Sequence, residues 1–425
     1  MRKPIVAVVS FPGSNGEVES MRIVRKTGME AMFFRWNDDR GKLKDVDGYF
    51  VPGGFSYEDR GRSGMVAARD NLMEFIDSEA ESGKVVIGIC NGAQILVESG
   101  LIPNGDGLRM SLARNAVRTP DRAKEPPFLS EWIWITRSCA KDRCATSWWD
   151  GVMKIPIAHG EGRFTTRDAE LINELKKNDQ IAFSYCNGNG DVSDDPEVTP
   201  NGSLHAIAGI CNPAGNVIAL MPHPERAQGG GDMYFESMRR WMEKRKSGKR
   251  GQKRQMAQKE YANVVLRDRV HLPIGSTANV EIFIETLIVN NEERTVEKAA
   301  RRIIPALALK QWKYLSVEEG AVGNIMSDLT VFNSNKERAF LRRGKLFSQW
   351  DHDSKSEAAI SSFFAGTVLI RRDIPDAFCS AFMNGAETGT AYGIENISEQ
   401  ELCSNRLLEI FANPHASTLE RLILK

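Results

Sequence analysis

Short apolar runs separated by helix-compatible stretches dominate the first 245 residues of this chain. Unbroken apolar runs are typical of strands that are buried on both faces of a largely parallel sheet. The stretches 17–27 and 65–81 are compatible with crossover helices. The runs cover residues 5–9, 31–34, 48–51, 85–89, 181–185, 206–210 and 217–220. We therefore predict an α/β domain over residues 1–245, with a mostly parallel sheet and helices on both faces.

The character of the chain changes after this region. Residues 246–260 continue a stretch rich in Lys, Arg, Gln and Gly, which we interpret as a basic linker with a solvated surface. Residues 261–425 carry no catalytic signature and are predicted to form a smaller α+β module. Its expected strands lie at 280–289, 364–371 and 419–424, and its expected helices at 295–304 and 398–411.

Composition excludes several classes of protein. Lys plus Arg and Asp plus Glu both number 56, so the charge balance favours no nucleic-acid partner. No apolar run approaches the ~20 residues that a membrane helix needs, and the N-terminal apolar stretch is too short for a signal peptide. The seven cysteines are odd in number and scattered, which indicates a reducing, cytoplasmic location rather than disulfides. Cys139 and Cys144 lack the spacing of a zinc site, so we predict no metal.

A cysteine stands where the apolar run 85–89 ends and a helix-compatible stretch begins. Gly88 and Gly92 flank Cys90, so the backbone can bend sharply and a substrate can approach. Such a strand-to-helix turn is the geometry of a nucleophile elbow. The partial positive charge of a helix start favours a thiolate and a developing oxyanion. A single cysteine in this position is more often a small core residue, so the interpretation depends on other motifs.

Further motifs could complete such a site. His223 could serve as a base and Glu225 could orient it, as triad chemistry requires. Two backbone N–H groups are needed for an oxyanion hole. Asn91 directly follows the cysteine, and Gly53 and Gly54 follow the strand 48–51. Taken alone, the two glycines would be an ordinary loop.

Together these motifs resemble a known family. Pro52-Gly53-Gly54, the segment 88–94 and the segment 222–225 are similar to those of the class I, triad-type glutamine amidotransferases. The longer segments 8–15, 52–59 and 159–164 narrow the resemblance to the glutaminase subunits of phosphoribosylformylglycinamidine synthase, of purine biosynthesis. The resemblance covers residues 1 to about 245.

The resemblance implies a reaction and its residues. Cys90 would attack the side-chain amide of glutamine, His223 would protonate the leaving ammonia, and the thioester would be hydrolysed to glutamate. Gln94 would hold the bound glutamine, and the segment with His159, Glu161 and Arg163 would line the same pocket. The ammonia would pass to a separate synthetase subunit that uses ATP and magnesium. This chain has no Gly-x-x-x-x-Gly-Lys-Ser/Thr loop, so we expect no cofactor in it.

Some segments depart from the family. Glu58 stands where relatives often carry Gly, and 62–64 differ too; we expect these positions to affect partner contacts. The segment 121–150 with its tryptophans matches the family pattern poorly, and we expect the tryptophans to be packing residues. In the C-terminal part, 280–284, 407–414 and 418–424 partly resemble the small bridging subunit of the same synthase. One enlarged copy, two diverged copies, an unrelated module and a mere packing extension all remain open.

Two other functions remain possible. The domain could be a non-catalytic scaffold that only docks the synthetase, although the intact Cys90, His223 and Glu225 set argues against this. It could also be a cysteine hydrolase of the same superfamily without a synthetase partner, although Gly53, Gly54 and Gln94 argue against that.

Overall fold

The structure is a computed structural model that describes residues 2–104, 107–116, 128–246, 264–269, 279–374 and 386–423. The chain forms two compact units. Unit 1 comprises Met1–Arg122 and Pro126–Ala262, and unit 2 comprises Ala123–Glu125 and Asn263–Lys425. Of the predicted linker 246–260, only Lys246 lies within the described residues, where it ends a helix.

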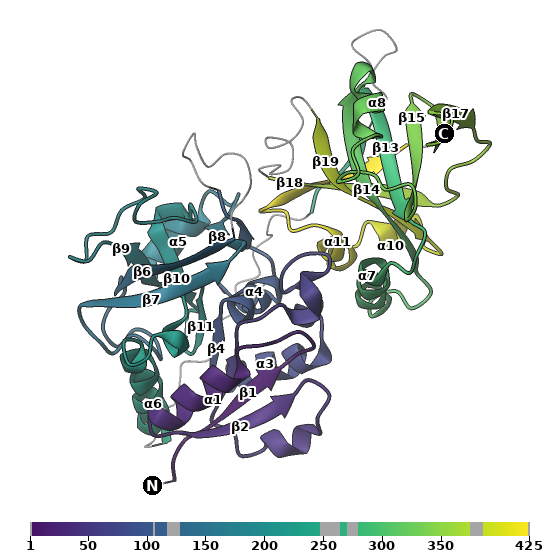
Figure 1. The fold of residues 1–425 in the computed structure, drawn as a ribbon. Helices are drawn as coiled ribbons and strands as arrows, with labels where there is room; N and C mark the ends of the chain where they lie inside the picture. The colour runs from purple at the N-terminus through teal and green to yellow at the C-terminus, as the bar shows by residue number, and fades with distance from the viewer. Residues whose placement is uncertain are drawn as a thin grey trace. The chain divides into compact units, whose positions relative to one another are not determined.

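Unit 1 is built on a nine-stranded sheet (Figure 1). Its order is β2-β1-β3-β4-β11-β10-β9-β6-β7. The strands are β1 (Ile5–Ser10), β2 (Glu30–Arg35), β3 (Gly48–Val51), β4 (Val85–Ile89), β6 (Leu129–Arg137), β7 (Val152–His159), β9 (Ile181–Cys186), β10 (Ile207–Cys211) and β11 (Val217–Leu220). Two further strands, β5 (Ser111–Arg114) and β8 (Glu161–Thr165), pair separately.

Pairing divides this sheet into two halves. From β2 to β11 all four neighbouring pairs are parallel, as the sequence predicts. From β11 to β7 the four pairs are antiparallel, which the expectation of a mostly parallel sheet missed. The reason is connection length, because β10 and β11 are joined only by residues 212–216. A connection that short makes a hairpin, whereas a parallel crossover needs a dozen residues or more.

All seven predicted apolar runs are strands, but β5 to β8 were not predicted. In β6 only three of nine residues are buried, and the others are exposed or half-buried. A strand with one solvated face carries mixed polar and apolar residues, so it lacks the unbroken apolar run on which the prediction relied.

Helices cover both faces of the sheet (Figure 1). The helices are α1 (Glu17–Lys26), α2 (Met65–Ala68), α3 (Asn71–Glu81), α4 (Asn91–Glu98), α5 (Leu171–Lys177) and α6 (Asp232–Lys246), with 3-10 turns η1 (Arg40–Leu43), η2 (Ser56–Asp59), η4 (Leu204–Ala206) and η5 (Pro224–Arg226). The single helix predicted over 65–81 is broken, because Asp70 has extended backbone angles and its carboxylate accepts the Leu72 N–H at 2.9 Å. Asp70 thereby caps a new helix.

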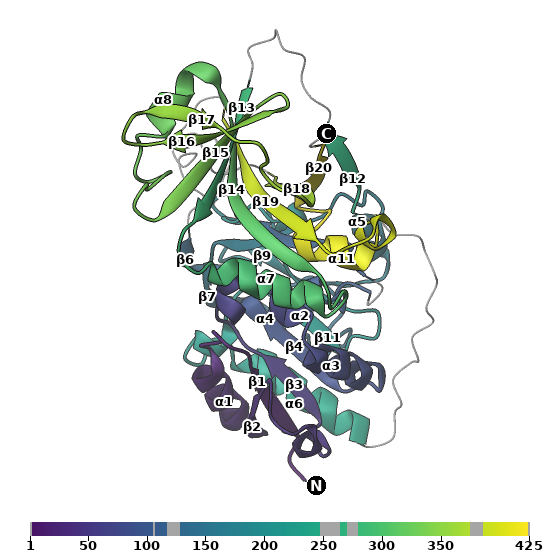
Figure 2. The same ribbon diagram turned by 90° about the vertical axis from the view of Figure 1, so that its right-hand side faces the viewer.

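Unit 2 is dominated by a second nine-stranded sheet, of order β12-β20-β18-β19-β14-β13-β15-β16-β17 (Figure 2). Its strands are β12 (Leu266–Arg269), β13 (Asn279–Thr286), β14 (Ala308–Glu318), β15 (Glu337–Arg343), β16 (Leu346–Asp351), β17 (Ser356–Ala359), β18 (Thr367–Asp373), β19 (Glu387–Glu395) and β20 (Ser417–Leu422). Its helical elements are α7 (Asn291–Arg301), η6 (Glu319–Ala321), α8 (Val322–Ile325), α10 (Glu399–Leu402) and α11 (Asn405–Phe411).

The predicted helix over 398–411 is two short helices, α10 and α11. Ser398 begins the first with a capping box that includes Glu401, and the chain turns at Cys403 and Ser404 before the second. The predicted strands at 280–289, 364–371 and 419–424 correspond to β13, β18 and β20, with shifted ends.

The tryptophans of unit 1 differ in their surroundings. Trp149 is buried and stacks on Phe183 at 5.7 Å between ring centroids, which is the expected packing role. Trp132 is 55% exposed on β6, so packing does not explain it. Among the described residues, the structure contains no helix with the length and apolar character needed to cross a membrane.

Candidate active site

Cys90 occupies a strained turn between β4 and α4. Its backbone has φ 53° and ψ −110°, in the left-handed region that residues other than glycine seldom adopt. The turn is held on both sides, because the Cys90 N–H donates to the Leu220 carbonyl at 2.8 Å and its carbonyl accepts the Gln94 N–H at 3.1 Å. The thiol is 6% exposed and lies 3.5 Å from the Ala158 carbonyl oxygen. The predicted nucleophile therefore sits on a tight, tethered elbow.

Glycine is required next to this elbow. A Cβ on Gly92 would stand 1.9 Å from the Val51 carbonyl oxygen, so β3 and α4 approach too closely for any side chain. A Cβ on Gly88 would lie 2.4 Å from the Gly92 carbonyl oxygen. The two glycines flanking Cys90 thus allow the close packing that fixes the thiol.

His223 and Glu225 form a buried pair at η5. His223 Nδ1 lies 2.5 Å from Glu225 Oε1, and the His223 N–H donates to the Pro156 carbonyl at 2.8 Å. Burial lowers the pKa of His223, but Glu225 and Cys90 more than offset this and raise it to about 10. The imidazole is therefore protonated at neutral pH, with Glu225 as its counter-ion.

Gly53 lies between the imidazole and the cysteine. A Cβ added to it would stand 2.8 Å from His223 Cε1 and 3.5 Å from Cys90 Cβ. Residues 53, 90 and 223 thus lie next to one another, although 37 and 133 positions separate them along the chain. This juxtaposition brings a thiol, an imidazole and a glycine turn together.

The Gly53–Gly54 peptide has a fixed orientation. The Gly53 carbonyl accepts N–H groups from Asn15 at 3.4 Å and Gly16 at 3.1 Å, at the start of α1. Because the carbonyl and the next N–H of a trans peptide point in opposite directions, the Gly54 N–H points away from α1. Gly54 has φ 148°, a conformation open to glycine alone. The turn is tied to the elbow, since the Ser56 N–H donates to the Asn91 Oδ1 at 3.0 Å.

Gln94 and Glu161 belong to one hydrogen-bonded network. The Gln94 amide donates to the Glu161 carbonyl at 2.5 Å, and the Asn91 amide donates to the Gln94 Oε1 at 2.9 Å. The Ser63 N–H donates to the Glu161 carboxylate at 3.4 Å. Two predicted substrate-binding residues are thus connected to the residue after the nucleophile.

Asp59 joins this network and was not among the predicted site residues. Its carboxylate accepts from the Asn91 amide at 3.2 Å. Burial, and next the negative charge of Glu161, raise the pKa of Asp59 to about 7. The backbone of Tyr57, Glu58 and Asp59 has positive φ throughout, from 52° to 58°. The available signal was its membership of the segment 52–59 that carries the family resemblance.

His159 and Arg163 are placed differently from Gln94. His159 is buried with its Nδ1 3.1 Å from Asn115 Oδ1, and its ring covers Gly162, where a Cβ would be 2.3 Å away. Burial, and next the charge of His223, lower the pKa of His159 to about 3, so it is neutral. The Arg163 guanidinium donates to the Arg114 carbonyl at 2.9 Å and so braces β8 on β5.

Arg62, at one of the positions expected to affect partner contacts, is held inside the domain. Its guanidinium makes a two-pronged ion pair with Glu98 at the end of α4, with distances of 3.0 and 2.6 Å, and the side chain is only 12% exposed. By contrast Glu58 is 73% exposed and pairs with Arg60 at 2.8 Å. Arg62 thus supports the helix that begins at the nucleophile.

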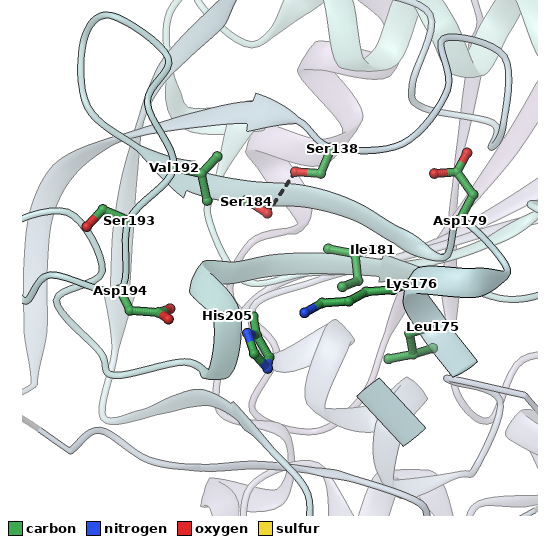
Figure 3. A pocket seen from close by; sticks show the side chains of 10 residues that line it. All are labelled: Ser138, Leu175, Lys176, Asp179, Ile181, Ser184, Val192, Ser193, Asp194 and His205. Carbon is green, nitrogen blue, oxygen red and sulfur yellow. Dashed lines mark hydrogen bonds between the residues drawn. The ribbon is translucent and has the colours of Figure 1, made fainter. Parts of the chain in front are cut away.

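Another cavity of unit 1 lies apart from these residues (Figure 3). It has a volume of about 420 Å³, and none of the predicted site residues lines it. Its polar lining includes Lys176, Asp194 and His205, with a hydrogen bond of 2.7 Å between Ser138 and Ser184 (Figure 3). Within the described residues, no group of three or more His, Cys, Asp or Glu side chains is arranged to hold a metal ion.

Comparison with known proteins agrees with this geometry. Residues 3–259 match the model of the CobB/CobQ-like glutamine amidotransferase domain. Phosphoribosylformylglycinamidine synthase subunit PurQ of Methanothrix thermoacetophila is 41% identical over 260 residues, which cover 57% of this chain and 99% of that protein. This chain belongs to the PurQ family of glutamine amidotransferases.

Two further proteins are similar to part of this chain. PurQ of Pyrococcus furiosus is 37% identical over 222 residues, covering 52% of this chain and 88% of that protein. A chain of the PurLQS structure from Thermotoga maritima is 32% identical, with a TM-score of 0.44, and the match covers 56% of this chain and 99% of that chain. The family model ends at residue 259, so residues 263–425 of unit 2 lie outside that match.

Proposed function

We propose that this chain hydrolyses glutamine to glutamate and ammonia and supplies the ammonia to a phosphoribosylformylglycinamidine synthase. The observation that carries the proposal is the meeting of Cys90, His223 and Gly53, with Glu225 bonded to the imidazole. A thiol, a protonated imidazole and a fixed glycine turn are the groups that amide hydrolysis by a cysteine requires.

The geometry supports a two-stage reaction. The Cys90 sulfur attacks the side-chain carbonyl carbon of glutamine, and the Gly54 and Asn91 N–H groups stabilise the resulting oxyanion. The C–N bond then breaks, and His223 gives its proton to the departing ammonia. In the second stage, His223 takes a proton from a water molecule that attacks the thioester, which releases glutamate and regenerates the thiolate.

Glutamine would bind beside Gln94 and Glu161. The Asn91–Gln94–Glu161 network connects the Glu161 backbone to Gln94, which lies one helical turn from the nucleophile. The carboxylate of Glu161 provides negative charge for the α-ammonium group of glutamine. His159 contributes through its backbone and its packing on Gly162, and Arg163 contributes by fixing β8.

The ammonia would be consumed by a separate synthetase subunit, to which the ATP and magnesium chemistry belongs. The names of the PurQ and PurLQS relatives support this partner. The test is glutaminase turnover of the full chain with and without a PurL-type synthetase subunit. We expect turnover that the partner stimulates. Binding to the synthetase without turnover would indicate a docking scaffold, and turnover of other amides without the partner would indicate a general cysteine hydrolase.

Unit 2 would act as a built-in bridging module between glutaminase and synthetase. Its tail, with α11 followed by Asn413, Pro414 and β20, supports the resemblance to the small bridging subunit. Removal of residues 263–425 should leave glutaminase turnover intact and weaken association with the synthetase. Unchanged association, measured by analytical ultracentrifugation of the mixture, would contradict this role.

A further inference from the structure

A second cavity lies in unit 2, on one face of its sheet. It has a volume of about 580 Å³, within the range of small-molecule pockets. Its lining comes from β13, β14, β15, β16 and the end of β19, and from the segment 360–364 before β18. Alternate residues of a strand point to the same face, and the pairing of Phe283 with Phe340 and of Glu285 with Arg338 aligns the strands. Aromatic residues therefore form one band and charged residues the next.

The aromatic residues of this face surround Phe363, and we call this group the aromatic cage. Phe363, from the segment 360–364, lies 4.9 Å from Phe283, 5.0 Å from Trp312 and 5.4 Å from Phe340, measured between ring centroids. Phe364 meets the Trp312 ring edge-on at 5.4 Å. Rings at these separations pack against one another, and four of them, Trp312, Phe340, Phe363 and Phe364, also line the cavity and give it an aromatic wall.

Trp312 carries an unused hydrogen-bond donor in this cage. The residue is 3% exposed, and its indole Nε1 is buried with no hydrogen-bond partner. Buried donors are nearly always paired, because an unpaired one loses its bond to water without compensation. A stacked ligand with a ring nitrogen or carbonyl acceptor would supply the missing partner.

The charged band presents cations at the rim. Glu285 lies 3.1 Å from Lys310 Nζ and 3.3 Å from Arg338 Nε. The side chain of Glu285 is only 12% exposed, whereas Lys310 is 36% and Arg338 44% exposed. Within this ion-paired trio, the groups that reach solvent are therefore donors with positive charge, which suit a phosphate.

We propose that this cavity binds a nucleoside monophosphate, with the base in the aromatic cage and the phosphate at Lys310 and Arg338. The Gln349 amide, on the same face, offers a donor and an acceptor to the edge of the base. The exposed Glu395 carboxylate, also in the lining, accepts hydrogen bonds from ribose hydroxyls and opposes a longer, more highly charged phosphate chain. This site is independent of glutamine hydrolysis in unit 1.

The experiment is isothermal titration of the full chain with AMP, GMP, CMP and UMP at millimolar concentration, with adenosine and inorganic phosphate as separate probes. We expect one site per chain for at least one monophosphate and weaker binding of the matching nucleoside. Lys310→Gln with Arg338→Gln should reduce monophosphate affinity to that of the nucleoside. These rim residues are partly exposed, so the variant should fold, which circular dichroism would check.

Trp312→Phe isolates the donor, since it keeps an aromatic ring and removes Nε1. Loss of the Nε1 donor should weaken the binding of both the monophosphate and the nucleoside about fivefold or more, as expected for one lost hydrogen bond. Trp350→Phe is the matched control, because Trp350 Nε1 is also buried without a partner but lies outside the cavity lining. Lys313→Gln on the same strand controls for charge. The proposal fails if no monophosphate binds, or if inorganic phosphate alone binds with the same affinity as the monophosphate. It also fails if the rim variant and Lys313→Gln have the same monophosphate affinity.

Discussion

His223 and Glu225 face each other across 2.5 Å, between the imidazole Nδ1 and the carboxylate Oε1, and both are buried. The carboxylate does more than orient the ring, because it also keeps the imidazole protonated beside Cys90. A thiolate next to an imidazolium is the reactive form of a catalytic cysteine. Glu225 therefore links the two roles of His223, as counter-ion before attack and as proton donor to ammonia.

Replacement of Cys90 by Ser should abolish glutamine hydrolysis. An alkoxide is far harder to form than a thiolate, and the elbow offers no other nucleophile. Synthesis from free ammonia by the assembled complex should survive, because that route bypasses unit 1. Cys403→Ser, at an exposed thiol in unit 2, is the control and should leave both rates unchanged. Loss of ammonia-dependent synthesis in Cys90→Ser would contradict the proposed division of labour.

Replacement of Glu225 by Gln should lower kcat for glutamine by ~10²-fold or more, the usual cost of disabling a general acid–base. Since Glu225 raises the pKa of His223, the alkaline limb of the pH–rate profile should move to lower pH. Glu197→Gln, on an exposed loop, is the control. If the alkaline limb of the pH–rate profile does not shift, Glu225 only packs beside the His223 ring.

The same interaction predicts how stability depends on pH. The folded-state pKa of His223 is about 10, above its ordinary value near 6.5. The proton therefore stabilises the fold fully below about pH 6.5, and this contribution disappears as pH rises through about 10. Urea unfolding of wild type and His223→Gln between pH 6 and 10 should converge toward the alkaline end.

Asp59 should make stability fall as pH rises toward neutrality. Its folded-state pKa of about 7 lies above the ordinary value of 3.8, so the protonated form is favoured in the fold. Its stabilising contribution is complete below about pH 3.8 and is lost through about pH 7. Asp59→Asn mimics the protonated form and should be more stable than wild type at pH 8, on the order of 2 kcal/mol. Equal unfolding midpoints at pH 5 and pH 8 for both proteins would contradict this.

Glycine substitutions should separate packing from chemistry. Gly92→Ala should destabilise the protein by about 3 kcal/mol or more, because its Cβ would overlap backbone atoms of β3. Gly53→Ala meets the His223 ring instead, so it should reduce kcat with a smaller effect on the melting temperature. Gly160→Ala is the control, since its nearest neighbour would be Phe128 at 3.9 Å. Equal stability of the Gly92 and Gly160 variants would refute the packing argument.

Glu58→Gly should relieve backbone strain. Glu58 has φ 58° in a run of three left-handed residues, which costs a residue with a Cβ roughly 1 kcal/mol. We expect a small gain in the free energy of unfolding, measured in urea, at unchanged glutamine turnover. A loss of stability would show that the Arg60 ion pair of Glu58 outweighs the strain.

The local pattern of the sequence was sufficient for the parallel half of unit 1. Runs such as 85–89 are apolar throughout because both faces of their strands are covered, and this is visible without coordinates. The last two strands of the sheet, β6 and β7, and the break at Asp70 could not be predicted in this way. A strand with one solvated face has no unbroken apolar run. A capping residue inside a helical stretch is recognised only by its backbone angles.

The sequence by itself determined which chemical groups are available: a thiol between glycines, a distant imidazole and carboxylate, and a glycine pair after a strand. Only the tertiary structure decided which of them meet, because Gly53, Cys90 and His223 follow β3, β4 and β11, which strand order rather than sequence distance makes neighbours. It also gave Asp59 its place in the network, engaged Arg62 in an internal ion pair and placed Arg163 as a brace. Burial and neighbouring charge, which no linear pattern contains, set the opposite protonation of His159 and His223.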